Sequence, residues 1–390
     1  MGNANVKGRP TEAQTNAQTI LQIVTSVPSL LGSLYIIYHI LRSKKRRSKV
    51  FSRLMLAMSS MDFIFAVQGV LSSVPCPREL PIFLASGNWV TCEISGFLGQ
   101  AGKLSSILYN GGLALYFLVT IRYGWKEDFT RRRIELPIHM FCQGAGWGTA
   151  ILALVKDYFN PTRIGCRIIS YPPGCELFGF PCTRGENSAA YQLALFLYPA
   201  MAMFLWMVIS MAMIYTSIAK TERKMEERKE GQTWRQLSVH VQQEQQQQPN
   251  TTLSKKASMR RDFATQAALY CSAFIFCWLF SIVAASIVAY DSTPEYFFPI
   301  SILSSTMSSL QGFFNFLIYI RPRYLHYRRK KKKEKIRQQE ESQEAYVTTS
   351  AASSFGPVPL GRMAALKHAL SVNDDSDMDV EDILENEEGS

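Results

Sequence analysis

Seven apolar runs, each long enough for a helix to cross a lipid bilayer, dominate the chain. They occupy residues 17–41, 52–74, 92–123, 137–156, 190–219, 264–289 and 298–320. A spanning helix needs about 20 apolar residues, and backbone that enters a bilayer must satisfy its hydrogen bonds within helices or a closed barrel. The runs therefore predict an all-α integral membrane protein, a seven-helix bundle over residues 17–320. We expect a multi-pass protein of the plasma membrane.

Lys and Arg concentrate in alternate connectors between these runs. RSKKRRSK follows the first run, RYGWKEDFTRRR the third and RRKKKKEK the seventh. Basic connectors remain on the cytoplasmic side, which predicts an N-terminus outside and a C-terminus inside. The net charge of +11 is then a topology signal, and we expect no nucleic acid partner.

The polar segments complete the predicted domain organisation. Residues 1–16 form an extracellular N-terminus, and 220–263 form a cytoplasmic third loop that is partly disordered. Residues 321–337 are a basic amphipathic segment suited to the inner surface of the lipid bilayer. Residues 338–390 are a disordered, acidic cytoplasmic tail.

The third run has a polar face. At 100° per residue, Gln100, Lys103, Ser106 and Asn110 share one arc, and the opposite side carries Leu104, Leu108, Leu115 and Val119. An ammonium group at membrane depth is costly unless it is paired or hydrated, so Lys103 is predicted to point into the bundle. It either pairs or snorkels there, or it contacts an anionic or carbonyl-bearing ligand near the outer mouth.

Other runs carry single residues of interest. Asp62 is the one acid of the second run, and it is either functional or a hydrogen-bond anchor to a neighbouring helix. Trp147, between glycines, indicates close helix packing. Pro199 predicts a kink in the fifth helix.

Five cysteines fall on the predicted outer side: Cys76, Cys92, Cys166, Cys175 and Cys182. That side is oxidising, so disulfides are expected there. The short interval from Cys175 to Cys182 suits a local bridge, but the spacing alone leaves the connectivity open. We expect no metal site.

Several residues recur in the order of a known family. They are Cys92 at the start of the third run, Trp147, Pro199, Phe274, Cys277 and Trp278 in FIFCWLF, and Asn315 and Tyr319 in NFLIY. The chain between Ala17 and Tyr327 resembles a seven-helix G-protein-coupled receptor. YNGGLALYFLVTIRYG and QGFFNFLIY are similar to the cyclic-AMP-receptor-like group of protists, algae and fungi.

The resemblance implies a receptor that transmits an extracellular ligand signal to a heterotrimeric G protein. It implies a Cys92–Cys166 disulfide, which with Cys175–Cys182 leaves Cys76 free, and no cofactor. It also implies roles for three groups of residues. The residues that contact the ligand would be Gln100, Lys103 and Trp278. The polar anchors and switch of the bundle would be Asp62, Asn110, Asn315 and Tyr319, and the G protein would be faced by Arg122 and Tyr123.

The sequence also departs from the rhodopsin-like pattern. Ile121 precedes Arg122 where that family has Asp, so an ionic lock of the Asp-Arg-Tyr kind is not expected. Phe280 replaces the usual Pro of the sixth helix, and Phe316 follows Asn315 where that family has Asn-Pro in the seventh. Hinges are therefore expected at other positions.

Other function classes fit less well. A transporter or channel would use polar residues at membrane depth, but the sequence shows no inverted repeat. A retinal protein needs a Lys in the seventh helix, and 298–320 contains none. An enzyme is not expected, because the spans offer no catalytic constellation.

Regulation is predicted from the cytoplasmic segments. Ser258 follows two lysines in a pattern that basophilic kinases accept, and Ser371 and Ser376 each precede an acid by three positions. Phosphate adds about 1.5 to 2 negative charges per site. We expect kinases and an arrestin-like protein as partners.

Overall fold

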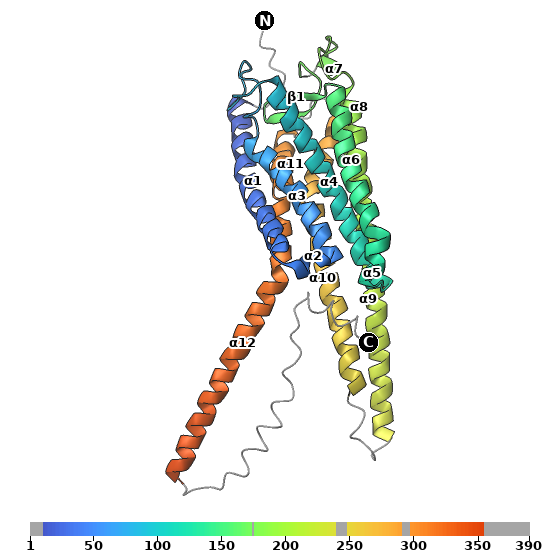
Figure 1. Ribbon diagram of the computed structural model, residues 1–390, viewed down its shortest axis with the longest axis vertical. Helices are drawn as coiled ribbons and strands as arrows, with labels where there is room; N and C mark the ends of the chain where they lie inside the picture. The colour runs from blue at the N-terminus through green and yellow to red at the C-terminus, as the bar shows by residue number, and fades with distance from the viewer. Residues whose placement is uncertain (1–10, 174, 239–247, 291–296, 355–390) are drawn as a thin grey trace. The chain divides into compact units, whose positions relative to one another are not determined.

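The computed structural model describes residues 11–173, 175–238, 248–290 and 297–354. It is almost entirely helical and divides into two units, Met1–Ile318 and Tyr319–Ser390. The first unit is a bundle of long helices that lie side by side (Figure 1). Six helical segments are long and apolar enough to cross a membrane: Glu12–Leu41, Val50–Leu71, Trp89–Arg122, Glu127–Val155, Ser188–Thr221 and Arg261–Ile287.

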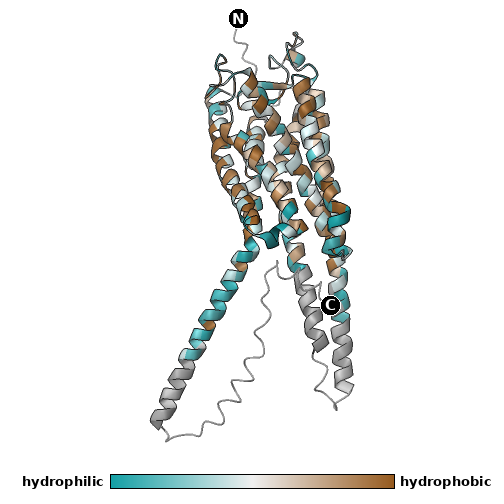
Figure 2. Ribbon diagram, in the orientation of Figure 1, coloured by the Kyte–Doolittle hydropathy of each residue, from teal (hydrophilic) through white to brown (hydrophobic). Residues whose placement is uncertain are grey.

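These segments correspond to the first six predicted spans. They are α1 (Glu12–Leu41), α3 (Val50–Leu71), α4 (Trp89–Arg122), α6 (Leu136–Val155), α9 (Tyr198–Ser238) and α10 (Gln248–Tyr290). Apolar side chains such as Leu31, Met140 and Leu205 are exposed on the perimeter, where Figure 2 shows the bundle helices in brown. In water such a surface would be unstable, so it faces lipid. The protein is a multi-pass membrane protein.

The seventh predicted span is broken into two helices. α11 (Phe297–Ser309) ends at a turn on Leu310, and α12 (Gln311–Ser354) begins directly after it. The Leu310 N–H reaches the carbonyls of Thr306 and Met307, and the Phe314 N–H reaches the Leu310 carbonyl. The chain therefore continues in nearly the same direction across the break. α11, with 13 residues, is too short to cross a bilayer alone. α12 has 44 residues but is too polar to count as an apolar span.

Helix α4 is the central helix of the bundle. Within its most apolar window, 89% of the residues are buried, against 50% or less in the other five spans. Leu104 and Leu108, on the side opposite Lys103, are buried against protein. The apolar side of α4 therefore does not face lipid. Both the polar and the apolar side of this helix contact neighbouring helices.

Small residues allow α1 and the start of α12 to approach closely. A Cβ on Gly312 would lie 2.5 Å from the hydroxyls of Ser29 and Ser33. One turn further, Phe316 packs edge-on against Tyr35, with ring centroids 5.1 Å apart. Such contacts of small residues are a common mode of helix packing in membranes.

Two π-helical turns interrupt the spans. η1 (Arg131–Glu135) links the short α5 (Glu127–Thr130) to α6, and η2 (Leu193–Leu197) links α8 (Ser188–Gln192) to α9. η2 ends at Leu197, two residues before Pro199, whose ring nitrogen cannot donate to the preceding turn. The irregularity predicted from Pro199 is thus a π-helical turn.

A hairpin of β1 (Phe159–Thr162) and β2 (Gly165–Ile168) covers one end of the bundle (Figure 1). We call this the cysteine end. Gly165 has φ +122°, and a Cβ there would lie 2.9 Å from the Ser72 carbonyl oxygen, so the tight turn requires glycine. Two disulfides lie at this end, Cys92–Cys166 and Cys175–Cys182, as predicted; the latter spans α7 (Cys175–Phe178).

Cys76 is free and fully buried beside the first disulfide, with its sulfur 3.5 Å from that of Cys166. Burial raises the pKa of the Cys76 thiol to about 11, and the thiol donates a weak hydrogen bond to the Thr162 carbonyl. The thiol is therefore protonated at neutral pH.

The opposite, basic end carries α2 (Lys44–Ser48), α5 and η1. Arg53 forms a two-point ion pair with Glu135, its Nη2 lying 2.7 Å from Oε2. The Glu127 carboxylate accepts from the backbone N–H of Val50, which begins α3. These contacts join α3 to the segment that follows α4.

Three helices extend beyond their predicted limits. α9 continues to Ser238 and α10 begins at Gln248, so much of the predicted third loop, 220–263, is helical. The predicted basic segment 321–337 lies within α12, which continues to Ser354; the prediction of an unstructured tail from 338 is thus wrong for residues 338–354. Gln, Glu and Arg there favour helix. Residues 355–390 lie outside the described residues, as does the predicted N-terminus before residue 11.

Candidate ligand cavity and the polar path beneath it

Two adjoining cavities, of about 100 Å³ and 180 Å³, lie inside the bundle toward the cysteine end. We treat them together as the cavity. Its walls come from α1, α3, α4, α10, α11, the hairpin and η2. The residues common to both parts are Lys103, Arg167, Gln192, Phe196, Ser281, Ser304 and Ser305.

Lys103 points into the bundle, as predicted. Its ammonium nitrogen lies 3.4 Å from the centroid of the Phe196 ring and 5.3 Å from that of Trp278. Cation–π contacts of this kind offset part of the cost of removing the charge from water. No ion pair to Lys103 is found within the described residues.

Arg167 is a second cation in the cavity, and the sequence analysis missed it. It follows Cys166 on β2, so the disulfide to α4 holds it at the cavity. Its guanidinium donates to the side-chain oxygen of Gln22 on α1, at 3.3 Å. The Arg167 side chain is exposed, although desolvation by the surrounding protein groups lowers the pKa of its guanidinium from its ordinary value.

Gln100 lies one turn from Lys103 on α4 and also lines the cavity. Its side chain is buried, and its Nε2 has no hydrogen-bond partner within the described part of the chain. A buried amide donor without a partner is costly. Gln100 and Lys103, which share one arc of α4, thus line the same cavity.

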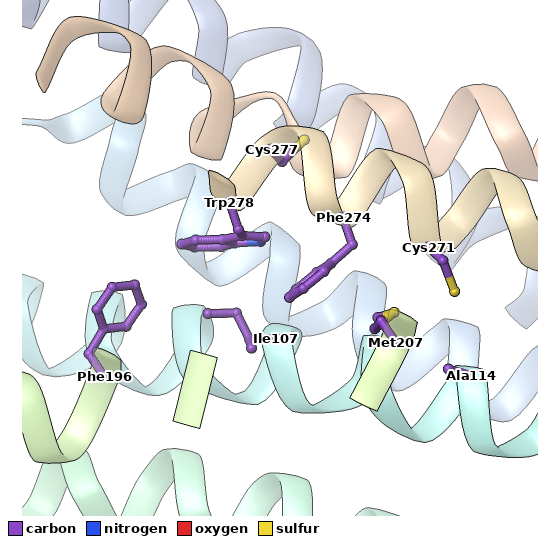
Figure 3. Packing of buried hydrophobic residues seen from close by; sticks show 8 residues of the cluster. All are labelled: Ile107, Ala114, Phe196, Met207, Cys271, Phe274, Cys277 and Trp278. Carbon is purple, nitrogen blue, oxygen red and sulfur yellow. The ribbon is translucent and has the colours of Figure 1, made fainter. Parts of the chain in front are cut away.

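Trp278 does not line the cavity among the described residues; it lies one layer beneath it. The side chain is fully buried in a cluster with Ile107, Phe196, Met207, Phe274 and Cys277. Figure 3 shows the Trp278 ring above Ile107, with Phe196 on one side and Phe274 on the other. Trp278 therefore connects to the cavity through Lys103 and Phe196.

A buried polar path continues from Trp278. Its indole N–H donates to the side-chain carbonyl of Gln311. The amide nitrogen of Gln311 donates to the Ser106 hydroxyl at 2.7 Å and lies 3.3 Å from a carboxylate oxygen of Asp62. Ser106 also donates to Asp62, and Asn315 donates to the other Asp62 oxygen at 2.8 Å.

Asp62 is therefore a hydrogen-bond anchor that joins α3, α4 and α12. The predicted anchors Asp62 and Asn315 meet here, whereas Asn110 donates to the Ser106 carbonyl of its own helix. Tyr319 belongs to the second unit, where the Arg323 guanidinium lies 4.8 Å from its ring centroid. Gln311 was not singled out from the sequence, because one Gln beside a Gly carries no periodic signal.

Other predicted sites lie elsewhere. Arg122, at the basic end, donates to the Met213 carbonyl of α9 at 3.2 Å, and both it and Tyr123 are exposed. Gly146 beside Trp147 packs against Ser105 of α4, whereas Gly144 and Gly148 face open space. Ser258 falls within α10, and Ser371 and Ser376 lie outside the described residues.

The comparisons with known proteins concern the fold. The structure is similar to the crystal structure of squid rhodopsin, with a TM-score of 0.57 and 15% sequence identity over 80% of this chain and 78% of that chain. No protein-family model matches the sequence. No curated protein matches it either. This likeness shows the fold alone: a bundle of membrane-length helices like that of squid rhodopsin.

Proposed function

We propose that this chain is a receptor that transmits an extracellular ligand signal to a heterotrimeric G protein. The observation that carries the proposal is the buried path from the cavity to α12, through Lys103, Trp278, Gln311 and Asp62. A ligand-induced change in the cavity can therefore reach α12 through direct contacts between buried side chains. The seven-helix fold supports the proposal.

The helix break at Leu310 is the point at which a change along this path would move α12. Gln311 is the first residue of α12 and binds both the Trp278 indole and the Asp62 cluster. A ligand that favours a different position of Lys103 or Phe196 would shift the balance between two arrangements of Trp278 and Gln311. The coupling between the cavity and the basic end is then a free-energy difference between these arrangements.

The basic end is the proposed G-protein face, on the cytoplasmic side. Its connectors carry the Lys and Arg excess that sets orientation, and Arg122 and Tyr123 are exposed there. Arg122 bridges α4 and α9 through the Met213 carbonyl. Separation of α9 from α4 would release this contact and leave the guanidinium available to a partner.

Further proposals follow from the sequence. They are a plasma-membrane location, membership of the cyclic-AMP-receptor-like group, and regulation by kinases and an arrestin-like protein through Ser258, Ser371 and Ser376. Each phosphate would add charge beside a basic surface.

The test is a ligand screen in cells with G-protein dissociation as the readout. We expect one ligand class to cause dissociation in cells that express the chain, and Arg122→Ala to abolish the response without lowering surface expression. Arg78→Gln, an exposed arginine at the cysteine end, is the matched control and should respond normally. An epitope tag at residue 3 should stain without permeabilisation.

A response that Arg122→Ala leaves intact would contradict the assigned G-protein face. The same screen without dissociation in any G-protein background, together with ligand uptake, would favour a transporter.

A further inference from the structure

Among the residues that the structure describes, two cations and no acid line the cavity. Lys103 from α4 and Arg167 from β2 both line its two parts, and the two positive charges repel one another. None of the described residues that line it is Asp or Glu. The nearby acids Glu93 and Asp157 are bound to Arg184 instead.

Lys103 is half-buried and Arg167 is exposed at the same cavity, and two like charges held side by side without a counter-charge are unfavourable. Within the described residues, the aromatic rings around Lys103 and the Gln22 contact of Arg167 supply no negative charge. The amide nitrogen of Gln100, buried and without a partner within the described residues, is a third donor at the same cavity. Three donors from α4 and β2 thus line one cavity, to which the described part of the chain contributes no anionic acceptor.

We propose that the cavity binds a small organic anion, whose carboxylate or phosphate group lies between Lys103 and Arg167 and accepts a hydrogen bond from Gln100. This inference rests on the proposed function, because it assigns a ligand class to the same receptor cavity. An oxyanion would satisfy all three donors at once. Charge-assisted hydrogen bonds to such a group are stronger than those between neutral groups.

The remaining walls select the body of the ligand. Phe65, Phe159 and Phe196 line the cavity beside the donors, so the anion is attached to a flat or apolar group. The two parts measure about 100 and 180 Å³, which limits the ligand to a small molecule. Serines of α10 and α11 would bind its additional polar groups.

Thermal unfolding of the purified full chain tests the proposal with defined probes: phenyl phosphate, benzoate and, as the neutral analogue, benzamide. Cys142, Cys271 and Cys277 are buried, so a thiol-reactive dye reports unfolding. A ligand that binds only the folded protein raises Tm. We expect phenyl phosphate or benzoate to raise Tm with a saturable dose dependence, and benzamide to leave it unchanged; the more effective acid identifies phosphate or carboxylate.

Variants locate the effect. Lys103→Met and Arg167→Gln should each lower the affinity for the anion about tenfold or more, and Gln100→Leu should lower it less. Arg78→Gln, which removes a positive charge outside the cavity, should bind the anion normally and is the matched control. Without anion, Lys103→Met should unfold at the same temperature as the native chain or higher, because a repelling charge is removed; a purely structural lysine would give a lower Tm.

Equal stabilisation by benzamide, or an anion effect that persists in Lys103→Met and Arg167→Gln together, would overturn the proposal. The absence of stabilisation by both acids at millimolar concentration would overturn it too. These outcomes do not depend on a G protein. A chain that causes G-protein dissociation with a neutral ligand would retain the receptor function and lose the anion assignment.

Discussion

The indole N–H of Trp278 on α10 donates to the side-chain carbonyl of Gln311, the first residue after the break in the seventh span. This bond joins the aromatic cluster under the cavity to the Asp62 anchor. Each group is buried, so the loss of one leaves the other without a partner.

A double-mutant cycle on this pair measures the link. Trp278→Phe removes the donor and Gln311→Leu removes the acceptor, and each should cost about 1 to 3 kcal/mol because a buried polar group loses its partner. The double variant should show a coupling energy of about 0.5 to 3 kcal/mol, measured by thermal unfolding in detergent. Ser60→Ala is the control, because within the described residues this hydroxyl bonds only its own helix, at the Leu56 carbonyl. Additive effects would show that the two residues do not interact.

Alanine substitutions at two glycines distinguish the effect of close helix packing on stability from the effect of helix propensity. Gly312→Ala should destabilise the protein by about 1 to 3 kcal/mol, because the new Cβ meets the Ser29 and Ser33 hydroxyls at 2.5 Å and the Ser29 carbonyl at 3.0 Å. Gly148→Ala should be neutral or stabilising by about 0.5 to 1 kcal/mol, because nothing lies within 4 Å of its Cβ. Tm of the two variants is the measurement. Equal effects would argue against the close approach of α1 and α12.

The ion pair at the basic end should respond to charge reversal. Arg53→Glu or Glu135→Arg alone should lower stability, and the double reversal should recover part of the loss. Because both side chains are partly exposed, at 26% and 11%, the pair itself contributes about 1 kcal/mol or less. Tm in low and high salt checks this, since screening weakens exposed pairs. A double reversal no better than either single variant would contradict the pairing.

Cys76 gives the folded state a dependence on alkaline pH. Its pKa is raised by burial to about 11, against 9.0 in the unfolded chain, so the thiol stabilises the fold fully below pH 9. This stability is lost as the pH rises through 11, by about 2 to 3 kcal/mol. Stability of the native chain should therefore fall more steeply between pH 9 and 11 than that of Cys76→Ala.

Peptide mapping supplies the second measurement for Cys76. At neutral pH the native protein should give Cys92–Cys166 and an unmodified Cys76, with alkylation of Cys76 only after unfolding. Labelling of Cys76 in the folded protein at pH 7 would contradict its burial.

The sequence predicted the features that depend on local pattern. Apolar run length predicted the spans, and a charge at membrane depth predicted that Lys103 points inward. The isolated Asp62 marked a residue that is either functional or a hydrogen-bond anchor, and left that choice open. The Cys92–Cys166 pair followed from the family resemblance. These features are carried by residue type and spacing along one helix, or by one matched position.

What the sequence did not predict depends on tertiary contacts. Arg167 lies in a polar connector, where a charge is ordinary, and only the hairpin and its disulfide bring it to the cavity. Gln311 acquires its role from Trp278 and Asp62, far away in the chain. The break at Leu310 shows no Pro or Gly at the turn itself, so hydropathy joined α11 and α12 into one span.

The burial of α4 also bears on how such a chain can diverge. The lipid-facing side chains of the perimeter helices need only remain apolar, so one apolar residue can replace another there with little effect on the fold. α4 meets protein on nearly every side, so its residues are constrained by those of α3, α6, α9, α10 and the hairpin, which pack against it. Sequence similarity between distant relatives should therefore persist mostly in α4 and be lost sooner in the outer helices. Averaged over the whole chain, the similarity of α4 would contribute little.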